Sequence, residues 1–170
     1  MKTTKDIVLK VVFVMAVLVV TAILISNEPI LESIGQAPKA ALSIDQQKFV
    51  DKLGYPDVFV VTMEGDRRKE IWTYFDHEKH FYFNNGVFSD HRTQEKLPDG
   101  FVWPKLRPTE FKNGMTEKEL EQIFNKPTAA GRVNLKIMEG IKFYDYYNQV
   151  KVAIFDGKII YVQTLPVPTR

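Results

Sequence analysis

The stretch HFYFNNGVFSDH, residues 80–91, decides how the central part of this chain folds. Strand-like runs lie on both sides of Asn85-Gly86, HFYF (80–83) before it and VFSDH (87–91) after it. An Asn-Gly pair between two such runs predicts a two-residue type I′ turn, because both turn positions need a positive φ. A turn of this kind sets the pairing of the strands that it joins. The predicted register places three pairs opposite each other: Phe83 with Phe88, Tyr82 with Ser89, and His80 with His91.

The same pattern returns 71 residues later, because Phe49–Phe88 matches Leu120–Ile159 without an insertion. Asp156-Gly157 takes the place of the first turn and predicts a second turn of type I′. A match that runs through helix-like, strand-like and turn segments predicts one supersecondary unit that is used twice. The other matched positions are Pro56 with Pro127, Trp72 with Phe143, and Phe83 with Ile154.

Each of the two units is predicted to begin with a short amphipathic helix. In the first unit Ser43 is the predicted N-cap, and the apolar stripe consists of Ile44, Phe49, Val50 and Leu53. In the second unit Thr116 and Glu119 form a capping box, and the stripe consists of Leu120, Ile123 and Phe124. The strands that follow should cover these stripes. We expect the helix-facing side of the sheet to carry Trp72, Tyr74, Phe81, Phe83 and Phe88, and in the second unit Phe143, Val152, Ile154 and Ile159.

Residues 7–26 form an apolar stretch in which Lys10 carries the only charge. A helix of this length is about 30 Å long, which matches the hydrocarbon core of a bilayer. Lys2 and Lys5 precede it, and the positive-inside rule then predicts a single-pass protein of the bacterial inner membrane, with the domain facing the periplasm or the cell exterior. A cleaved signal peptide is the rival interpretation, although this stretch is longer than a usual signal core and no A-x-A-like site follows closely.

The predicted fold class is α+β, with two tandem helix-plus-antiparallel-sheet repeats behind one N-terminal transmembrane helix. Three prolines in the segment between the repeats predict an extended connector. The predicted organisation is a cytoplasmic tail (1–6), a transmembrane anchor (7–26), a tether (27–41), repeat 1 (42–92), a proline-rich connector (93–112), repeat 2 (113–165) and a tail (166–170).

The composition argues against several classes of function. The net charge is +2, and basic residues alternate with acidic ones instead of clustering, so we expect no nucleic-acid partner. The chain has no cysteine, which excludes disulfides, thiolate nucleophiles and a lipid-modified cysteine. It also lacks the G-x-S-x-G, G-x-G-x-x-G and P-loop motifs. We therefore expect no enzyme, no cofactor and no small-molecule substrate, and as partners the membrane through residues 7–26 and another envelope protein.

The run FKNGMTEKELEQIFNKP, residues 111–127, followed by aromatic strands and by IFDGKIIYVQ, residues 154–163, resembles the SmpA/OmlA (BamE-like) family of outer-membrane assembly lipoproteins. Two such units in tandem are also similar to the beta-lactamase inhibitory protein. The resemblance implies a small envelope scaffold that binds other proteins. The positions that carry it are Gly114-Met115-Thr116, Asn125-Lys126-Pro127, Phe143 with Tyr144, and Asp156-Gly157.

Four aromatic residues are left without an obvious cover by the predicted register, and we interpret them as a protein-binding surface: Phe75, Tyr82, Tyr144 and Tyr146. The alternative is that this face makes the contact between the two repeats, or is covered by the connector through Trp103. The expected function is thus a membrane-anchored, non-catalytic assembly scaffold of the cell envelope. An inhibitor-like module that docks on an enzyme is the first alternative.

A periplasmic metal-binding protein is the second alternative. Its ligands would come from His77, His80 and His91, because a cross-strand histidine pair with a nearby carboxylate provides donors that transition metals accept. The competing interpretation is a set of polar histidines at the end of a hairpin, since the matched positions of the second unit are Asn148, Lys151 and Val162. We therefore predict no metal site.

Overall fold

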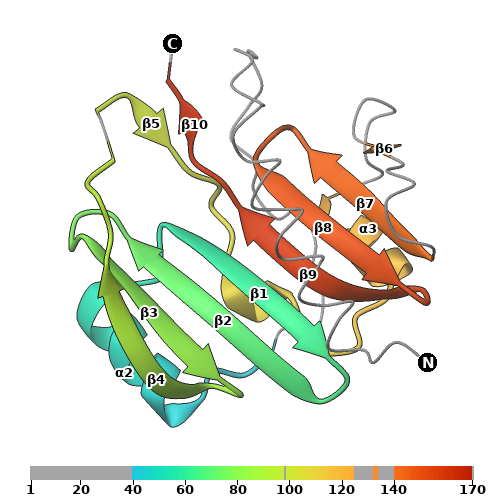
Figure 1. The fold of residues 1–170 in the computed structure, drawn as a ribbon, viewed down its shortest axis with the longest axis horizontal. Coiled ribbons are helices and arrows are strands. Elements are labelled where there is room, and N and C mark those ends of the chain that lie inside the picture. Colours follow the sequence, from blue (N-terminus) through green and yellow to red (C-terminus); the bar gives the residue numbers. More distant parts are fainter. Residues whose placement is uncertain (1–39, 98, 125–131, 134–139, 170) are drawn as a thin grey trace.

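Eight strands form one antiparallel sheet, in the order β4-β3-β2-β1-β9-β8-β7-β6 (Figure 1). The computed structural model describes residues 40–97, 99–124, 132–133 and 140–169. The strands of the sheet are β1 (Val58–Glu64), β2 (Arg67–Tyr74), β3 (Lys79–Asn84), β4 (Val87–Thr93), β6 (Arg132–Val133), β7 (Ile141–Tyr146), β8 (Val150–Phe155) and β9 (Lys158–Thr164). A separate two-stranded sheet consists of β5 (Phe101–Val102) and β10 (Val167–Pro168).

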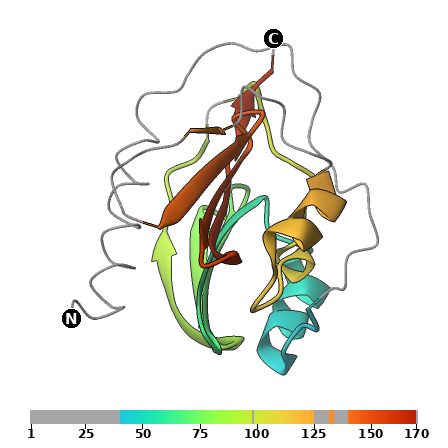
Figure 2. The same cartoon turned by 90° about the vertical axis from the view of Figure 1, so that its right-hand side faces the viewer.

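Two short helices, α2 (Ile44–Leu53) and α3 (Glu117–Phe124), lie on the same face of the sheet (Figure 2). A 3₁₀ turn, η1 (Pro108–Glu110), precedes α3 in the chain. Both predicted N-terminal caps are confirmed, because the Gln46 amide donates to Ser43 Oγ at 3.1 Å and the Thr116 amide donates to Glu119 Oε2 at 2.8 Å. Each cap satisfies amide groups that have no partner inside the helix.

The prediction of two tandem helix-plus-antiparallel-sheet repeats behind a transmembrane helix is wrong, because the strands form one continuous sheet. β1 and β9 pair in antiparallel register from Val60 with Gln163 to Thr62 with Tyr161. Two separate repeats would leave these strands as open edges, and unpaired edges expose backbone groups that bind other chains. Their pairing removes two edges and joins the halves of the chain.

The predicted anchor at 7–26 and the tail before it lie outside the described residues. Within the ranges that the structure describes, no helix is long and apolar enough to cross a membrane. The longest helix among them, α2, has 10 residues, whereas a span needs about 20. The prediction of a single-pass inner-membrane protein is therefore wrong for the part of the chain that the structure describes.

Both predicted type I′ turns are confirmed. The φ angles are 49° at Asn85 and 79° at Gly86, and 49° at Asp156 and 70° at Gly157. Asn and Asp tolerate this left-handed conformation better than other side chains do, and Gly adopts it without steric penalty. The two dipeptides were thus sufficient to predict the turns of both hairpins.

The predicted register holds only beside the first turn, where Phe83 pairs with Phe88. The register then shifts between Tyr82 and Phe83, because β4 contains one extra residue at that point. The predicted pairs Tyr82 with Ser89 and His80 with His91 are wrong. Instead Tyr82 pairs with Asp90, and His80 pairs with Arg92.

The larger of two buried apolar clusters, which we call the main core, lies between the helices and the sheet. The helix-facing side of the first unit is confirmed, because Trp72, Tyr74 and Phe83 are buried in this main core. The corresponding prediction for Phe143 is wrong, because this ring lies in a second cluster with Ile141, Ala153 and Tyr161. One stripe residue of α2 is also wrong, since Ile44 is 79% exposed at the start of the helix.

The length of one turn explains the misplacement of Phe143. Four residues separate Tyr74 from its partner Lys79, whereas only three separate Tyr146 from its partner Val150. A one-residue difference moves every side chain of a strand to the other face. Tyr144, not Phe143, therefore occupies the position that corresponds to Trp72.

Replacing Gly86 with Ala should lower the free energy of unfolding by about 2–3 kcal/mol. An added Cβ would lie 2.7 Å from Ser43 Cβ and 2.9 Å from its hydroxyl oxygen. That hydroxyl donates a hydrogen bond to the Gly86 carbonyl at 2.5 Å, so the substitution disturbs the start of α2 as well as the turn.

The matched control is Gly157→Ala, where φ is 70° and no atom lies within 4 Å of the added Cβ. Only backbone strain remains there, which costs roughly 1 kcal/mol. Urea denaturation of both variants measures the difference. Equal losses would show that the hairpin turn does not depend on its contact with Ser43.

Candidate functional site

The four aromatic residues predicted to form a binding surface do not lie together. Tyr144 and Tyr146 are buried in the main core under the helices. Phe75 is also buried, and its ring centroid lies 5.9 Å from that of Trp103 in the connector. Tyr82 is half-buried, with the Arg92 guanidinium 5.4 Å from its ring centroid. The expectation of a single uncovered aromatic face is therefore wrong, and the alternative of a cover by Trp103 applies to Phe75.

The three histidines point to different environments. His80 Nδ1 lies 2.7 Å from Thr73 Oγ1, and burial lowers the pKa of its imidazole. His91 pairs with Phe81 on the other face of the hairpin, and His77 is exposed beside the Tyr74 ring. The described ranges contain no group of three or more side chains that could hold a metal ion. The bulge in β4 thus separates the two histidines that the sequence pattern had paired.

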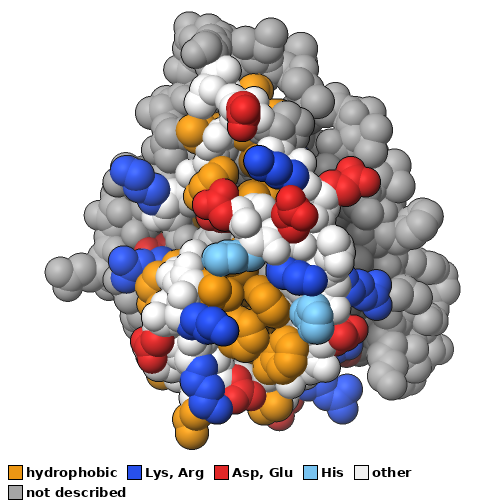
Figure 3. Space-filling view, turned by 90° about the vertical axis from the view of Figure 1, so that its left-hand side faces the viewer, with side chains coloured by type: hydrophobic (Ala, Val, Ile, Leu, Met, Phe, Trp, Pro, Cys, Tyr) orange, Lys and Arg blue, Asp and Glu red, His pale blue; other side chains and the backbone are white. Residues whose placement is uncertain are grey.

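A groove of about 410 Å³ opens between the C-terminal half of α2 and the beginning of β3. We call it the phenylalanine groove. Figure 3 shows an apolar patch on this side of the molecule, with lysine, arginine and histidine side chains at its border and aspartate and glutamate side chains among them. The residues that line the groove are Lys48, Phe49, Lys52, Leu53, His77, Lys79 and Phe81.

The floor of the groove follows from the pattern of α2 and β3. Phe49 and Leu53 are four residues apart, so they lie on one face of the helix. Phe81 projects from the strand toward them, and its ring centroid lies 4.7 Å from that of Phe49. Phe88 of β4 completes the cluster at 5.3 Å from Phe49 and is 37% exposed. The rings support one another but remain partly open to solvent.

The rim of the groove is positively charged. Lys48 makes an exposed ion pair of 3.2 Å with Asp45, whereas Lys52 and Lys79 have no ion-pair partner within the described part of the chain. None of the seven lining residues carries a carboxylate. The groove therefore offers apolar contact area and cations, but no carboxylate that would act as a general acid or base.

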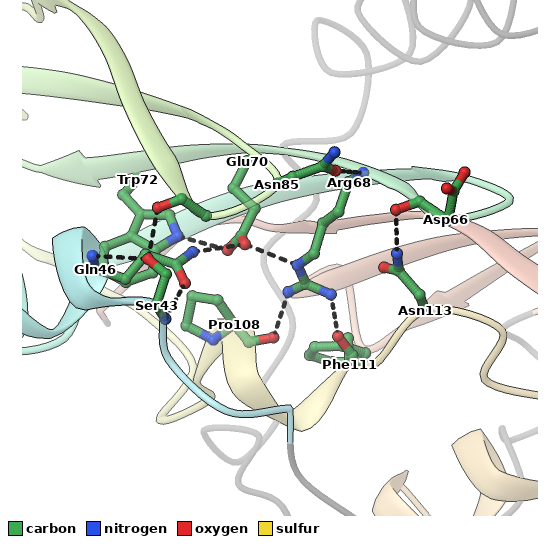
Figure 4. A network of polar contacts seen from close by, with 11 residues as sticks. Ser43, Gln46, Asp66, Arg68, Glu70, Trp72, Asn85, Pro108, Phe111 and Asn113 are labelled. Carbon is green, nitrogen blue, oxygen red and sulfur yellow. Dashed lines mark hydrogen bonds and ion pairs between the residues drawn. The ribbon is translucent and has the colours of Figure 1, made fainter.

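A second pocket, of about 290 Å³, lies beside the first turn of α2 and contains a buried ionic network. Glu70 is 3% exposed and accepts three hydrogen bonds (Figure 4). The donors are Gln46 Nε2 at 2.7 Å, Arg68 Nε at 2.7 Å and Trp72 Nε1 at 2.8 Å.

Arg68 extends this network to η1, because its guanidinium also donates to the carbonyls of Pro108, at 2.8 Å, and Phe111. Among the described residues, no buried side-chain nitrogen or oxygen lacks a hydrogen-bond partner. A satisfied network of this kind leaves no group directed at a ligand. We therefore interpret it as the connection between α2, β2 and the segment before α3.

No family model, curated protein or solved structure matches this chain. The resemblance to the SmpA/OmlA family stays a prediction, and the candidate site rests on the geometry alone. Sequence reasoning assigned Phe49 and Phe81 to the core and did not identify the groove. The signal was present in Lys48 and Lys52, which accompany the apolar stripe of α2 with the same four-residue spacing.

Proposed function

We propose that this protein is a non-catalytic protein-binding module that holds its partner in the phenylalanine groove. The observation that carries the proposal is the cluster of half-buried Phe49 and Phe81 with exposed Phe88 at the molecular surface. Binding hot spots are enriched in residues that become fully desolvated only in the complex. The exposed parts of these rings would lose their contact with water when a partner binds.

The packing of the cluster supports binding rather than catalysis. Phe49 contacts Phe81, Phe83 and Phe88, with centroid distances between 4.7 and 5.3 Å. Rings that already restrict one another lose little conformational freedom when a partner docks, and a preorganised surface binds more tightly for the same area. The groove thus has the rigidity of a recognition surface.

A photoreactive benzophenone amino acid in place of Lys52 tests the proposal in cells that express the full chain. Lys52 is exposed at the rim, so a partner in the groove should give one discrete crosslinked adduct. Lys158, which is exposed at the start of β9, is the matched control position and should give none. The adduct should disappear when Phe81→Ala is added, provided that the variant keeps its far-ultraviolet circular dichroism spectrum.

Two results would contradict a function in this groove. One is the absence of any adduct from the Lys52 position, and the other is the same adduct from both positions. Mass spectrometry of the adduct also distinguishes an assembly partner from an enzyme that the module inhibits.

A further inference from the structure

We infer that the segment bound in the phenylalanine groove is acidic and carries a large apolar side chain between its carboxylates. This inference rests on the proposed protein-binding function and specifies the chemistry of the partner. Two properties of the groove support it: the apolar floor, and a rim on which lysines from different elements converge.

The floor selects for a large apolar anchor. Its volume of about 410 Å³ lies within the range of roughly 300–1,000 Å³ in which proteins bind ligands. Phe49, Leu53 and Phe81 line it, and no buried polar group lies among the lining residues. An aromatic or branched aliphatic side chain would fill this space and displace water from the exposed parts of the rings.

The rim selects for carboxylates. Lys48 and Lys52 lie one helical turn apart on α2, and Lys79 approaches from β3. Like charges that surround one apolar depression repel one another, and Asp45 pairs with only Lys48. A carboxylate on each side of the anchor would relieve this repulsion, at the border of an apolar surface where charges are less screened than in bulk water.

Three synthetic peptides test the inference against the full-length protein. The first has a central Leu-Phe pair with four glutamates on each side, the second replaces the glutamates with lysines, and the third replaces Leu-Phe with Ala-Ala. NMR titration at low salt gives the dissociation constants and the sites of contact. We expect the first peptide to bind at least roughly tenfold more tightly than either of the others, given the strength of exposed charge pairs and of a buried anchor. The amide signals of Phe49 and Phe81 should shift.

Two double charge-reversal variants distinguish the effect of the groove lysines on peptide binding from the effect of the protein's net charge. The Lys52→Glu/Lys79→Glu variant should bind the acidic peptide about tenfold or more weakly than the original protein does. The Lys118→Glu/Lys158→Glu variant makes the same change of net charge at exposed positions of α3 and at the start of β9, and it should bind like the original protein. Raising the salt concentration should weaken only the binding that depends on the lysines.

Equal affinity for the acidic and basic peptides would overturn the inference, as would equal effects of the two double variants. Vesicles of phosphatidylglycerol test the alternative that the lysines bind an anionic lipid surface. Binding to these vesicles without binding to the acidic peptide would support that alternative and overturn the inference. An adduct from the Lys52 position combined with no acidic preference would refute the inference and leave the protein-binding function in place. The absence of an adduct together with the absence of an acidic preference would refute both the inference and the protein-binding function.

Discussion

Truncating Trp72 to Ala should lower the free energy of unfolding by about 3–5 kcal/mol. The side chain is fully buried at the centre of the main core, and its ring centroid lies 4.7 Å from that of Phe83. The substitution leaves a large cavity under α2 and also removes the donor that Trp72 Nε1 provides to Glu70. Urea denaturation followed by circular dichroism measures the loss.

Trp72→Phe is the informative control, because it keeps a ring in the core and removes the indole nitrogen. It should lose clearly less than the alanine variant. A loss below about 1 kcal/mol for Trp72→Ala would be typical of a surface position, and it would show that the main core does not lie between α2 and the sheet.

Changing Glu70 to Gln should destabilise the protein by about 3 kcal/mol, although the side chain keeps its size. The carboxylate accepts hydrogen bonds on both oxygens, and the amide would place an NH₂ group against the donors of Gln46, Arg68 or Trp72. Arg68, whose side chain is only 12% exposed, would then lose its counter-charge. Thermal and urea unfolding of the variant both report the effect.

Glu95→Gln removes the same charge at an exposed position and should change stability by less than about 0.5 kcal/mol. The double variant Glu70→Leu/Arg68→Met removes both charges together. It should recover part of the loss, because an apolar pair avoids the penalty of a single buried charge. Equal stability of Glu70→Gln and Glu95→Gln would argue that the network adds nothing to the fold.

The parts of the fold that the sequence predicted are those with a local cause. Asn85-Gly86 and Asp156-Gly157 adopt the predicted turns because two adjacent positions with positive φ tolerate few residue types. The capping box at Thr116 depends on an equally local pair of side chains. Such signals lie within a few residues of the structure that they produce, so one sequence is enough to recognise them.

The errors come from features that a periodic pattern does not contain. The extra residue in β4 and the shorter turn before Val150 each move a register by one position, and one position decides which face a side chain occupies. The shorter turn is why Tyr144 and Tyr146, predicted to face outward, are in the core. The pairing of β1 with β9 has no local signal, because it depends on which strand edges meet after both hairpins form.

The phenylalanine groove was also not predicted from the sequence, because it depends on how two elements pack together. The sequence showed that Phe49 and Phe81 belong to apolar patterns, but their partial exposure depends on how α2 packs against β3. The lysines at the rim come from the helix and from β3, and only the packing of these two elements brings their charges around one depression.

The pairing of β1 with β9 also sets a delay during synthesis of the protein. Phe59 donates its amide hydrogen to Thr164 Oγ1, which lies 105 positions later in the chain. At about 5–20 residues per second on the ribosome, β1 waits roughly 5–20 s for its neighbour to be made. Throughout that interval a strand that carries Phe59, Val61 and Met63 has one open edge in the nascent chain. Until β9 is made, β1 therefore keeps an edge that could pair with another chain, an exposure that the completed sheet no longer reveals.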